Sequence, residues 1–437
     1  MGRRYLRLAV IALLAACGWA LLVFATLDQG LFRSPIAKRG EPVRFLAAAY
    51  DRAEKHNRGN LALILIEDGR EVGSFALSEG EPVDSDSVFQ TASLGKWLTA
   101  WGVMALVERG RIDLDAPVST YLSRWRLPDS EFDESGVTVR RLLSHTAGLG
   151  DELGYDGFES ARDVQTLEAS LIRAADASPG KSGEVRIESE PGSGWRYSGG
   201  GYTLLQLVIE EVSGQPFARY MEETVFAPLG MKRTTFDHDR ALSSGLAQNF
   251  RPDGTTEPFR RYTALAASSL FTSAGDLARF IEAQAPGAGD AVLSPETRRL
   301  IASPHAARLG ADIWGLGAML YAPNEAGGYI IGHDGQNEPA INAAARIDPA
   351  SGDGIVVLST GGELLATGIA GEWVFWKTGN VDTLDFAAAI PSALAWLAAG
   401  WAVILAAALA AALRSRRRAE RGQALRPHAT VDYPCTQ

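Results

Sequence analysis

Cysteine and histidine are scarce in this sequence. Its two cysteines, Cys17 and Cys435, lie outside the region that we expect to form the globular domain. That expectation leaves the domain without a disulfide bond and without a cysteine-based metal site. The six histidines do not show HExxH or a similar ligand spacing, so we expect no metal ion and no other cofactor.

An excess of positive charge is also missing. The formal net charge is −10, which argues against a general nucleic-acid partner. Hydrophobic residues make up 46% of the 437 residues, enough for the core of one large domain or of two intertwined ones. Acidic residues concentrate in the middle of the chain, whereas arginines cluster at both extreme ends.

Two long apolar runs frame the middle of the chain. Residues 8–27 and 386–413 reach the length of about 20 residues that a helix needs to cross a membrane. Arginines precede the first run, and "RSRRRAER" follows the second. Because positive charge marks the cytoplasmic side of a span, we expect both termini in the cytoplasm. Residues 1–30 would then be an anchor, 386–413 a second membrane helix and 414–437 a basic cytoplasmic tail. The domain between them would lie on the periplasmic or extracellular face of the cell (inner) membrane.

The first run has two other readings. It could be a cleaved signal peptide, or a lipoprotein signal, since Leu14-Ala15-Ala16-Cys17 resembles a lipobox. Against both, the apolar run continues well past Cys17. All three readings export the middle of the chain.

The exported part reads as strands near both ends and helices between them. Apolar runs around the turn at 67–70 predict a hairpin, and short strands are predicted over 314–321, 328–335, 340–349 and 353–360. Helices are predicted over 42–59, 93–110, 137–149, 202–214, 273–284 and 363–379, with Ser273 as an N-cap. We therefore expect an α+β domain over 42–378. Its sheet would come from about 42–91 and 266–378, and about 92–265 would be an inserted helical subdomain.

Ser93 and Lys96, in "FQTASLGKWLTAW", are candidates for nucleophilic catalysis. Three residues apart on a helix, they share one face, and a serine needs such a nearby base to become a nucleophile. The ordinary alternative is a helix N-cap beside a solvated lysine. A second SxxK, at 178–181, contains Pro and Gly and reads as a loop.

The other common serine-hydrolase signal is absent. No serine here has a glycine two residues before it and another two residues after it, so there is no nucleophile elbow. His145, in "LLSHTAGL", then has no neighbouring elbow to serve. We interpret it as a structural histidine that caps a turn.

Several stretches, in order, resemble one family. They are "TASLGKWLTA", "GRIDLDAPVSTYL", "VTVRRLLSHTAGL", "PGSGWRYSGGGYTLLQLVIEEVSGQPF", "VFAPLGM", "SLFTSAGDLARFI" and "GHDGQNEPAINAAARIDPASGDGIVVLSTGG". Together they resemble the beta-lactamase-related serine hydrolases, which include class C beta-lactamases, DD-carboxypeptidases, D-aminopeptidases and family VIII esterases. The resemblance covers roughly 42–378. It implies an antiparallel sheet flanked by helices with an inserted helical subdomain.

The resemblance also implies roles for individual residues. The family's SxxK falls on Ser93 and Lys96, and its second motif, Tyr-x-Asn, falls on Tyr197 but has Gly199 in place of the asparagine. Ser93 would be acylated, with Lys96 and Tyr197 moving its proton. The missing amide lowers the expectation of an efficient beta-lactamase.

The third family motif, Lys/His-x-Gly, falls on His333 and Gly335. His333 would line the pocket opposite Ser93 and donate a hydrogen bond to Tyr197 or to a substrate carboxylate. Gly335 would keep a side chain out of the way of the substrate. The backbone N–H groups of Ser93 and Gln336 would bind the oxyanion. A histidine that is neutral near pH 7 makes a substrate without a carboxylate more plausible.

The sequence thus predicts a membrane-anchored serine hydrolase that acts through an acyl-enzyme on an ester or amide. A D-amino-acid peptide, cleaved as by a carboxypeptidase, and a small ester are near-equal substrates. The alternatives are a beta-lactamase and a penicillin-binding membrane receptor that is acylated without turnover. The group that activates water in deacylation stays open, as does the oligomeric state. Small residues at 398–400 would let the two membrane helices pack closely.

A literal Lys377-Thr378-Gly379 occurs near the second apolar run. Too few residues follow it for the strands that come after the family's third motif. We therefore interpret it as the end of the last helix, with Gly379 as the residue that stops the helix.

Overall fold

The computed structural model describes residues 2–150 and 155–424, so Cys435 and the end of the basic tail lie outside the described residues. The chain divides into two compact units. One contains residues 1–33 and 385–437, and the other residues 34–384. The second unit extends a few residues beyond both expected domain ends. The division of this domain into sheet and insertion segments stays a prediction.

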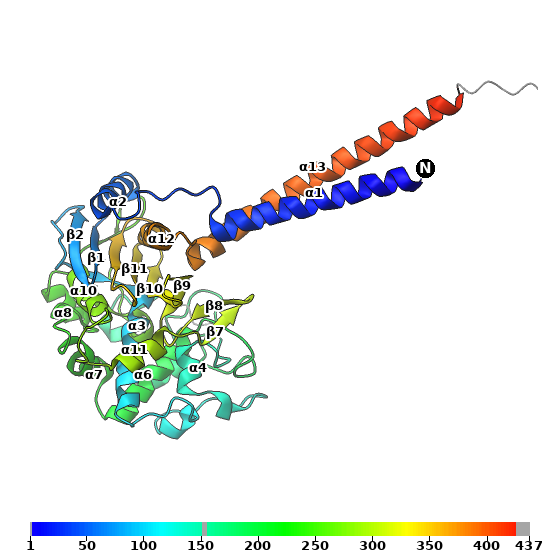
Figure 1. Cartoon of the computed structure of the whole chain (residues 1–437). Coiled ribbons are helices and arrows are strands. Elements are labelled where there is room, and N and C mark those ends of the chain that lie inside the picture. Colours follow the sequence, from blue (N-terminus) through cyan, green and yellow to red (C-terminus); the bar gives the residue numbers. More distant parts are fainter. Residues whose placement is uncertain (1, 151–154, 425–437) are drawn as a thin grey trace, which may run out of the picture. The chain divides into compact units, whose positions relative to one another are not determined.

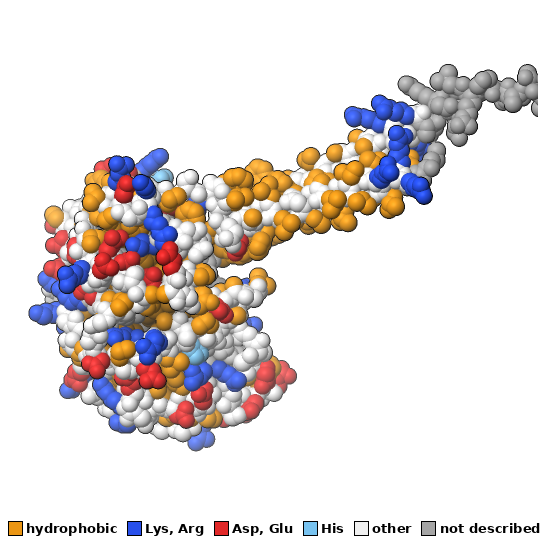
Figure 2. All heavy atoms as spheres, viewed as in Figure 1, with side chains coloured by type: hydrophobic (Ala, Val, Ile, Leu, Met, Phe, Trp, Pro, Cys, Tyr) orange, Lys and Arg blue, Asp and Glu red, His pale blue; other side chains and the backbone are white. Residues whose placement is uncertain are grey.

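The first unit consists mainly of two apolar helices, α1 (Gly2–Gln29) and most of α13 (Thr383–Ala424) (Figure 1). Both are long and apolar enough to cross a membrane. Hydrophobic side chains cover the pair, and Lys and Arg gather at one end (Figure 2).

Tryptophans and a glycine bring these two helices together. Trp19 Nε1 donates to the Trp396 carbonyl at 3.0 Å, and Trp401 Nε1 donates to the Ala16 carbonyl at 3.1 Å. A Cβ on Gly400 would lie 2.0 Å from Trp19 Nε1, so only glycine allows this approach. The predicted close packing at 398–400 is confirmed at Gly400.

The second unit is built on one eight-stranded sheet in the order β2-β1-β12-β11-β10-β9-β8-β7, with every neighbouring pair antiparallel (Figure 1). Its strands are β1 (Leu61–Glu67), β2 (Arg70–Leu77), β7 (Ala306–Arg308), β8 (Ala311–Trp314), β9 (Met319–Pro323), β10 (Tyr329–Asn337), β11 (Ile341–Ile347) and β12 (Gly354–Thr360). The N-terminal hairpin joins the C-terminal strands where Leu61 pairs with Ser359. The sequence therefore predicted the hairpin and this long-range sheet correctly.

One strand prediction is wrong. The segment 314–321 is not a single strand, because β8 ends at Trp314 and β9 begins at Met319. Gly317 between them has φ +81°, and a Cβ there would lie 2.2 Å from the Ala100 Cβ. This tight turn lets the strands fold back against the helical layer.

Helices cover both faces of the sheet. Alternate residues of β1 point to opposite faces: Leu61, Leu63 and Leu65 pack with α2 (Pro42–His56) and α12 (Leu365–Thr378). The intervening Ala62, Ile64 and Ile66 join the core with α3 (Gly95–Glu108) and α10 (Ala274–Glu282). Burial on both faces explains why β1 reads as a continuous apolar run.

The remaining helices are mostly short and lie largely between β2 and β7 in the chain. They are α4 (Val139–Leu143), α5 (Leu167–Ile172), α6 (Gly199–Ser213), α7 (Phe217–Met221), α8 (His238–Ser243), α9 (Leu265–Ser268) and α11 (Pro295–Ala302). Short 3₁₀ turns occur at Ala92–Leu94, Val118–Tyr121, Glu134–Gly136 and Ala161–Asp163, and a π-helical turn at Glu222–Phe226. Two small ribbons pair β3 (Val88–Gln90) with β6 (Phe271–Ser273), and β4 (Asn249–Phe250) with β5 (Thr256–Glu257).

Helix ends largely follow their predicted signals. The Ser273 side chain accepts from the Asp276 N–H at 3.1 Å and caps α10, and Gly379, with φ +76°, ends α12. Helix α2 stops at His56, before the predicted Gly59, because Asn57 adopts an extended conformation.

Candidate active site

Ser93 lies in the 3₁₀ turn Ala92–Leu94 that leads directly into α3. Ala92 has φ +47°, a left-handed conformation that costs a non-glycine residue on the order of 1–3 kcal/mol. The turn is tied down on one side, since the Thr91 N–H donates to the Leu270 carbonyl at 3.0 Å. Ser93 is half-buried, so the strained turn holds its hydroxyl at the edge of solvent.

Lys96 lies in the interior beside this serine. Its side chain is only 1% exposed, and Nζ lies 2.9 Å from Ser93 Oγ and also donates to the Ala267 carbonyl. Burial rules out the alternative in which Lys96 is a solvated surface residue. The pair has the geometry of a hydroxyl next to its base.

Tyr197 completes the cluster around Lys96. Lys96 Nζ lies 4.9 Å from the centroid of the Tyr197 ring and 5.7 Å from that of Tyr202. Ser93, Lys96, Tyr197, Gly199 and Gln336 all line one cavity of about 660 Å³. The structure thus brings four of the six predicted site residues to one cavity surface.

His145 belongs to this cluster, although the sequence interpretation gave it only a structural part. It is buried, and its ring lies 4.4 Å from the Tyr197 ring, centroid to centroid. Its Nδ1 accepts from the Ser198 N–H at 3.0 Å, which fixes the backbone just before α6. Burial, followed by the nearby Lys96 charge, holds the pKa of His145 well below its usual range. The sequence signal for its position near the site was its place in "LLSHTAGL", which is part of one of the stretches that resemble the family.

His333 lies in the wall behind the cavity and does not line it, contrary to our expectation. It is 1% exposed, on β10, with its ring 5.4 Å from that of Trp314. Its Nδ1 lies 2.6 Å from the Asp334 carbonyl, and because a carbonyl only accepts, Nδ1 carries the hydrogen. Nε2 is then an acceptor, and it has no hydrogen-bond partner among residues 2–150 and 155–424.

The charge state of His333 follows from the same surroundings. Burial, and then the Lys96 charge, lower the pKa of His333 to about 3. A neutral ring with its hydrogen on Nδ1 cannot donate from Nε2. The expected hydrogen bond from His333 to a substrate carboxylate is therefore wrong for this tautomer.

Gly335 has a different steric role from the one expected. A Cβ on this residue would lie 1.9 Å from the Thr91 carbonyl oxygen and 3.1 Å from the Leu94 nitrogen. The glycine thus lets β10 press against the turn that carries Ser93, whereas we expected it to clear the substrate. This contact brings Gln336, the next residue, to the cavity surface with Ser93.

Asp334, the middle residue of the tripeptide, points away from this cavity into a buried network. Its carboxylate accepts from Arg346 and from the Tyr321 hydroxyl at 2.7 Å, and the Thr367 hydroxyl also donates to it. Arg346 is fully buried, and its Nε donates to Asp382 at 3.0 Å. Burial works to lower the pKa of Arg346, but Asp334, Tyr321 and Asp382 outweigh it, so the pKa is raised. One guanidinium therefore fixes β10 and the start of α13.

The loop containing the second SxxK also reaches the cavity. Ser178 lines it, and its hydroxyl donates to Asp156, another lining residue. Our sequence interpretation of 178–181 as a loop is confirmed. That reading missed the contribution of Ser178 to the cavity wall, which depends on a contact distant in sequence.

The literal Lys377-Thr378-Gly379 is the end of α12, as predicted. Lys377 Nζ pairs with Asp353 at 2.7 Å and with Glu67 at 3.2 Å, which lie at turns of the sheet. None of these three residues lines the cavity that contains Ser93. The lysine is an anchor for α12 on the sheet.

This chain is similar in sequence to known proteins over most of its length. A model of the beta-lactamase family matches residues 44–372. Esterase EstB of Burkholderia gladioli is 30% identical over 332 residues, covering 64% of this chain and 81% of the esterase. Penicillin-binding protein 4 of Amycolatopsis lactamdurans is 28% identical over 334 residues, covering 71% of this chain and 83% of that protein. Penicillin-binding protein 4* of Bacillus subtilis is 35% identical, but this chain matches only 35% of its length.

Solved structures share the fold. The octameric penicillin-binding protein homologue from Pyrococcus abyssi superposes with a TM-score of 0.64 at 23% identity, covering 78% of each chain. The D-amino acid amidase of Ochrobactrum anthropi SV3, in complex with L-phenylalanine, gives 0.59 at 22% identity, covering 76% of this chain and 96% of the amidase. At such identities the likeness establishes the fold alone.

Proposed function

This chain belongs to the beta-lactamase family, and on that premise we propose that it is a membrane-anchored serine hydrolase acting through an acyl-enzyme on Ser93. One observation carries the proposal. A buried lysine, Lys96, has its Nζ 2.9 Å from the Ser93 hydroxyl oxygen, and both line a cavity of about 660 Å³. A buried amine beside a hydroxyl that faces a cavity is the arrangement that general-base activation of a serine requires.

In the proposed acylation, Ser93 Oγ attacks the carbonyl carbon of the substrate. The hydroxyl proton passes to the pair formed by Lys96 and Tyr197, in which one of the two groups is deprotonated, and the pair returns a proton to the leaving group as its bond to carbon breaks. The Lys96 contacts to Ser93 Oγ and to the Ala267 carbonyl fix the amine for this transfer. Water then cleaves the acyl-enzyme, releasing the acid and restoring Ser93.

The oxyanion is assigned in this proposal to the backbone N–H groups of Ser93 and Gln336. Close packing at Gly335 supports the assignment, because it brings β10 against the Ser93 turn. One donor of this kind typically contributes about 3 kcal/mol in the transition state. The strained Ala92 and the close contact would keep both donors preorganised.

Two substrate classes remain near-equal within this chemistry: peptides or amides of D-amino acids, and small esters. A beta-lactam ranks behind them, since the cavity has Gly199 where the family places an asparagine and since the neutral His333 offers no cation to a carboxylate. Esterase EstB supports the ester class as an analogy.

Covalent labelling tests the site. A fluorescent fluorophosphonate should label the wild-type protein and leave Ser93→Ala unlabelled; equal labelling of both would show that Ser93 is not the nucleophile. A panel of a p-nitrophenyl ester, a D-amino-acid amide, a D-Ala-D-Ala peptide and a chromogenic cephalosporin then ranks the substrates. A single stoichiometric acylation without further product on all four would instead identify an acylated receptor.

The membrane arrangement forms part of the proposal. Helices α1 and α13 would both span the bilayer, with Arg3, Arg4 and the arginines at 414–418 in the cytoplasm. A membrane-impermeant maleimide tests it in a background of Cys17→Ala and Cys435→Ala. On intact spheroplasts, Asp129→Cys in the catalytic domain should be labelled and Arg416→Cys should not; the reverse pattern would invert the topology.

A further inference from the structure

The charged groups at the cavity surface suggest which substrates enter it. Besides the buried Lys96, the charged residues in its lining are Asp156 and Glu338, and both are exposed. The Ser178 hydroxyl donates to Asp156, and Gln336 Nε2 donates to Glu338 at 3.2 Å. Neither carboxylate has an ion-pair partner in the part of the chain that the structure describes.

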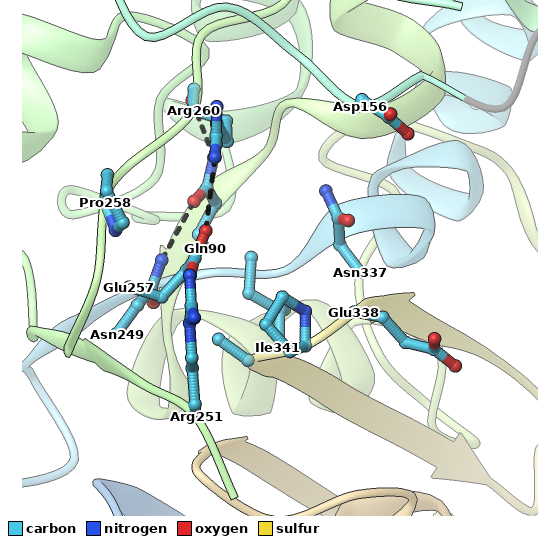
Figure 3. A pocket seen from close by; sticks show the side chains of 12 residues that line it. Gln90, Asp156, Asn249, Arg251, Glu257, Pro258, Arg260, Asn337, Glu338 and Ile341 are labelled. Atoms are coloured by element: carbon cyan, nitrogen blue, oxygen red, sulfur yellow. Dashed lines mark hydrogen bonds and ion pairs between the residues drawn. The ribbon is translucent and has the colours of Figure 1, made fainter. Parts of the chain in front are cut away.

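A second cavity, of about 350 Å³, shares Asp156, Asn337 and Glu338 with the first and continues from it. Figure 3 shows these three residues on one side of the second cavity and Arg251, Asn249 and Glu257 on the other. The two cavities therefore form one cleft, with the acidic pair at their junction.

Both arginines of the second cavity are already engaged. Arg251 Nε donates to Glu257 at 2.6 Å, and Arg260 bonds Glu257 at 3.3 Å and Glu159 at 2.9 Å. Glu257 is nearly buried, so this three-residue pairing would be costly to break. Neither guanidinium is thus a free cation for a substrate carboxylate.

A buried hydrogen-bond acceptor in the second cavity also favours a ligand that donates hydrogen bonds. Gln90 Nε2 donates to the Arg260 carbonyl at 2.9 Å, so its Oε1 accepts from Asn249 Nδ2 at 3.3 Å. This chain of amides leaves Asn249 Oδ1 as an acceptor without a partner among the described residues, in a side chain that is 1% exposed. Such an atom is satisfied only by a donor, from water or from a ligand.

We propose that the cleft selects acyl substrates that carry a protonated amine, and that Asp156 and Glu338 are the residues that recognise it. The inference rests on the proposed hydrolase function and specifies its substrate. An ammonium group brings positive charge and three donors to a junction whose unpaired charges are both negative. A carboxylate near the scissile bond, as in penicillins and D-Ala-D-Ala peptides, would meet like charge there. The structure thereby favours cationic amides and esters over carboxypeptidase substrates.

Three p-nitrophenyl esters of matched length test the charge preference: 6-aminohexanoate, heptanoate and the monoester of adipate. At low ionic strength we expect kcat/KM for the cationic ester to exceed that for the neutral one about tenfold, with the anionic ester poorer still. The double variant Asp156→Asn/Glu338→Gln should bring the cationic-to-neutral ratio near unity, and added salt should reduce the wild-type ratio. Asp129→Asn, an exposed carboxylate outside both linings, is the matched control and should keep the wild-type ratio.

The outcomes separate the two proposals. If no ester is hydrolysed above the Ser93→Ala background, the hydrolase proposal fails and this inference fails with it. If esters are hydrolysed but the wild type does not prefer the cation, or the double variant keeps the preference, only the inference about Asp156 and Glu338 is overturned.

Discussion

Two tripeptides that both fit the pattern Lys/His-x-Gly, His333-Asp334-Gly335 and Lys377-Thr378-Gly379, have very different surroundings. The first lies on β10, in the middle of the sheet, and its glycine contacts the turn that carries Ser93. The second ends α12 and anchors that helix to turns of the sheet. Lys377-Thr378-Gly379, the exact match to the motif, has a structural role. His333-Asp334-Gly335, the imperfect match, adjoins the cavity that contains Ser93. A short motif is therefore informative only together with the element that carries it and the strands that follow it.

The two lysines associated with these regions give the largest expected contrast. Lys96→Met removes the base beside Ser93 and should lower kcat/KM by about 10⁴-fold, the upper range for general-base catalysis. Lys377→Met removes two partly buried ion pairs and should cost about 1 kcal/mol of stability, with kcat/KM within about twofold of wild type. Ester kinetics and urea unfolding measure both; a large kinetic loss in Lys377→Met would reverse the assignment of the motifs.

The contacts of the two middle residues, Asp334 and Thr378, should give the next largest difference in stability. Arg346→Met leaves the partly buried Asp334 and the fully buried Asp382 without their cation and should cost about 3–5 kcal/mol of unfolding free energy. Thr378 Oγ1 donates to the Val374 carbonyl at 2.8 Å and accepts from the Asn380 N–H at 3.0 Å, both neutral and local bonds, so Thr378→Ala should change stability by about 1 kcal/mol. Arg346→Met/Asp334→Asn/Asp382→Asn, which removes both orphaned charges, should recover part of the loss. No recovery would mean that packing, and not charge, makes Arg346 important.

Substitution of the two glycines, Gly335 and Gly379, should give the third largest contrast. Gly335→Ala would place a methyl group against the Thr91 carbonyl, so β10 and the Ser93 turn must separate. We expect kcat to fall by about 10²-fold, the typical cost of losing one oxyanion donor. Gly379→Ala meets no atom within 4 Å and pays only for φ +76°, about 1 kcal/mol of stability. Equal kinetic effects in the two variants would contradict the close contact at Gly335.

The last comparison concerns the first residue of each tripeptide, His333 and Lys377, and the effect of pH on stability. His333 has a folded pKa of about 3, below the ordinary value of about 6.5, so the unfolded chain binds a proton that the folded protein does not. Its contribution to stability is complete above about pH 6.5 and falls by about 1.4 kcal/mol per unit as pH drops toward 3. His333→Gln should flatten this slope between about pH 6.5 and 5 in urea titrations at stepped pH. Lys377→Met should not change it there, because the pKa of its partner Asp353 is lowered and that carboxyl titrates below this window. An unchanged slope in His333→Gln would assign the effect to His145, whose pKa is also lowered.

Local patterns in the sequence predicted much of the fold. Apolar runs around a turn predicted the β1–β2 hairpin, and apolar residues at helical spacing predicted α3 and α12. The SxxK spacing predicted the contact between Ser93 and Lys96. These features depend on neighbours a few residues apart, so their physics is visible in a short window.

Other parts of the site depend on residues far apart in the chain. His145 bonds Ser198 across 53 positions, and Arg346 bonds Asp382 across 36. The steric reason for Gly335 lies at Thr91, and the partner of Ser178 is Asp156. No periodicity links such pairs, and a buried arginine on a strand reads in sequence as an edge or surface residue. Only the folded domain brings them together.

The position of Asp382 bears on how the catalytic domain can be prepared in water. Asp382 precedes α13, accepts from the Leu384 N–H at 2.7 Å, and shares Arg346 with Asp334. A chain ended at Gly379 to remove the apolar helix would discard this carboxylate and leave a fully buried guanidinium with a single counter-ion. The compact unit runs to Leu384, and a shortened protein that stops there retains the whole network. The C-terminal boundary of a stable truncated protein is thus determined by the ion pair between Arg346 and Asp382, and not by the end of α12.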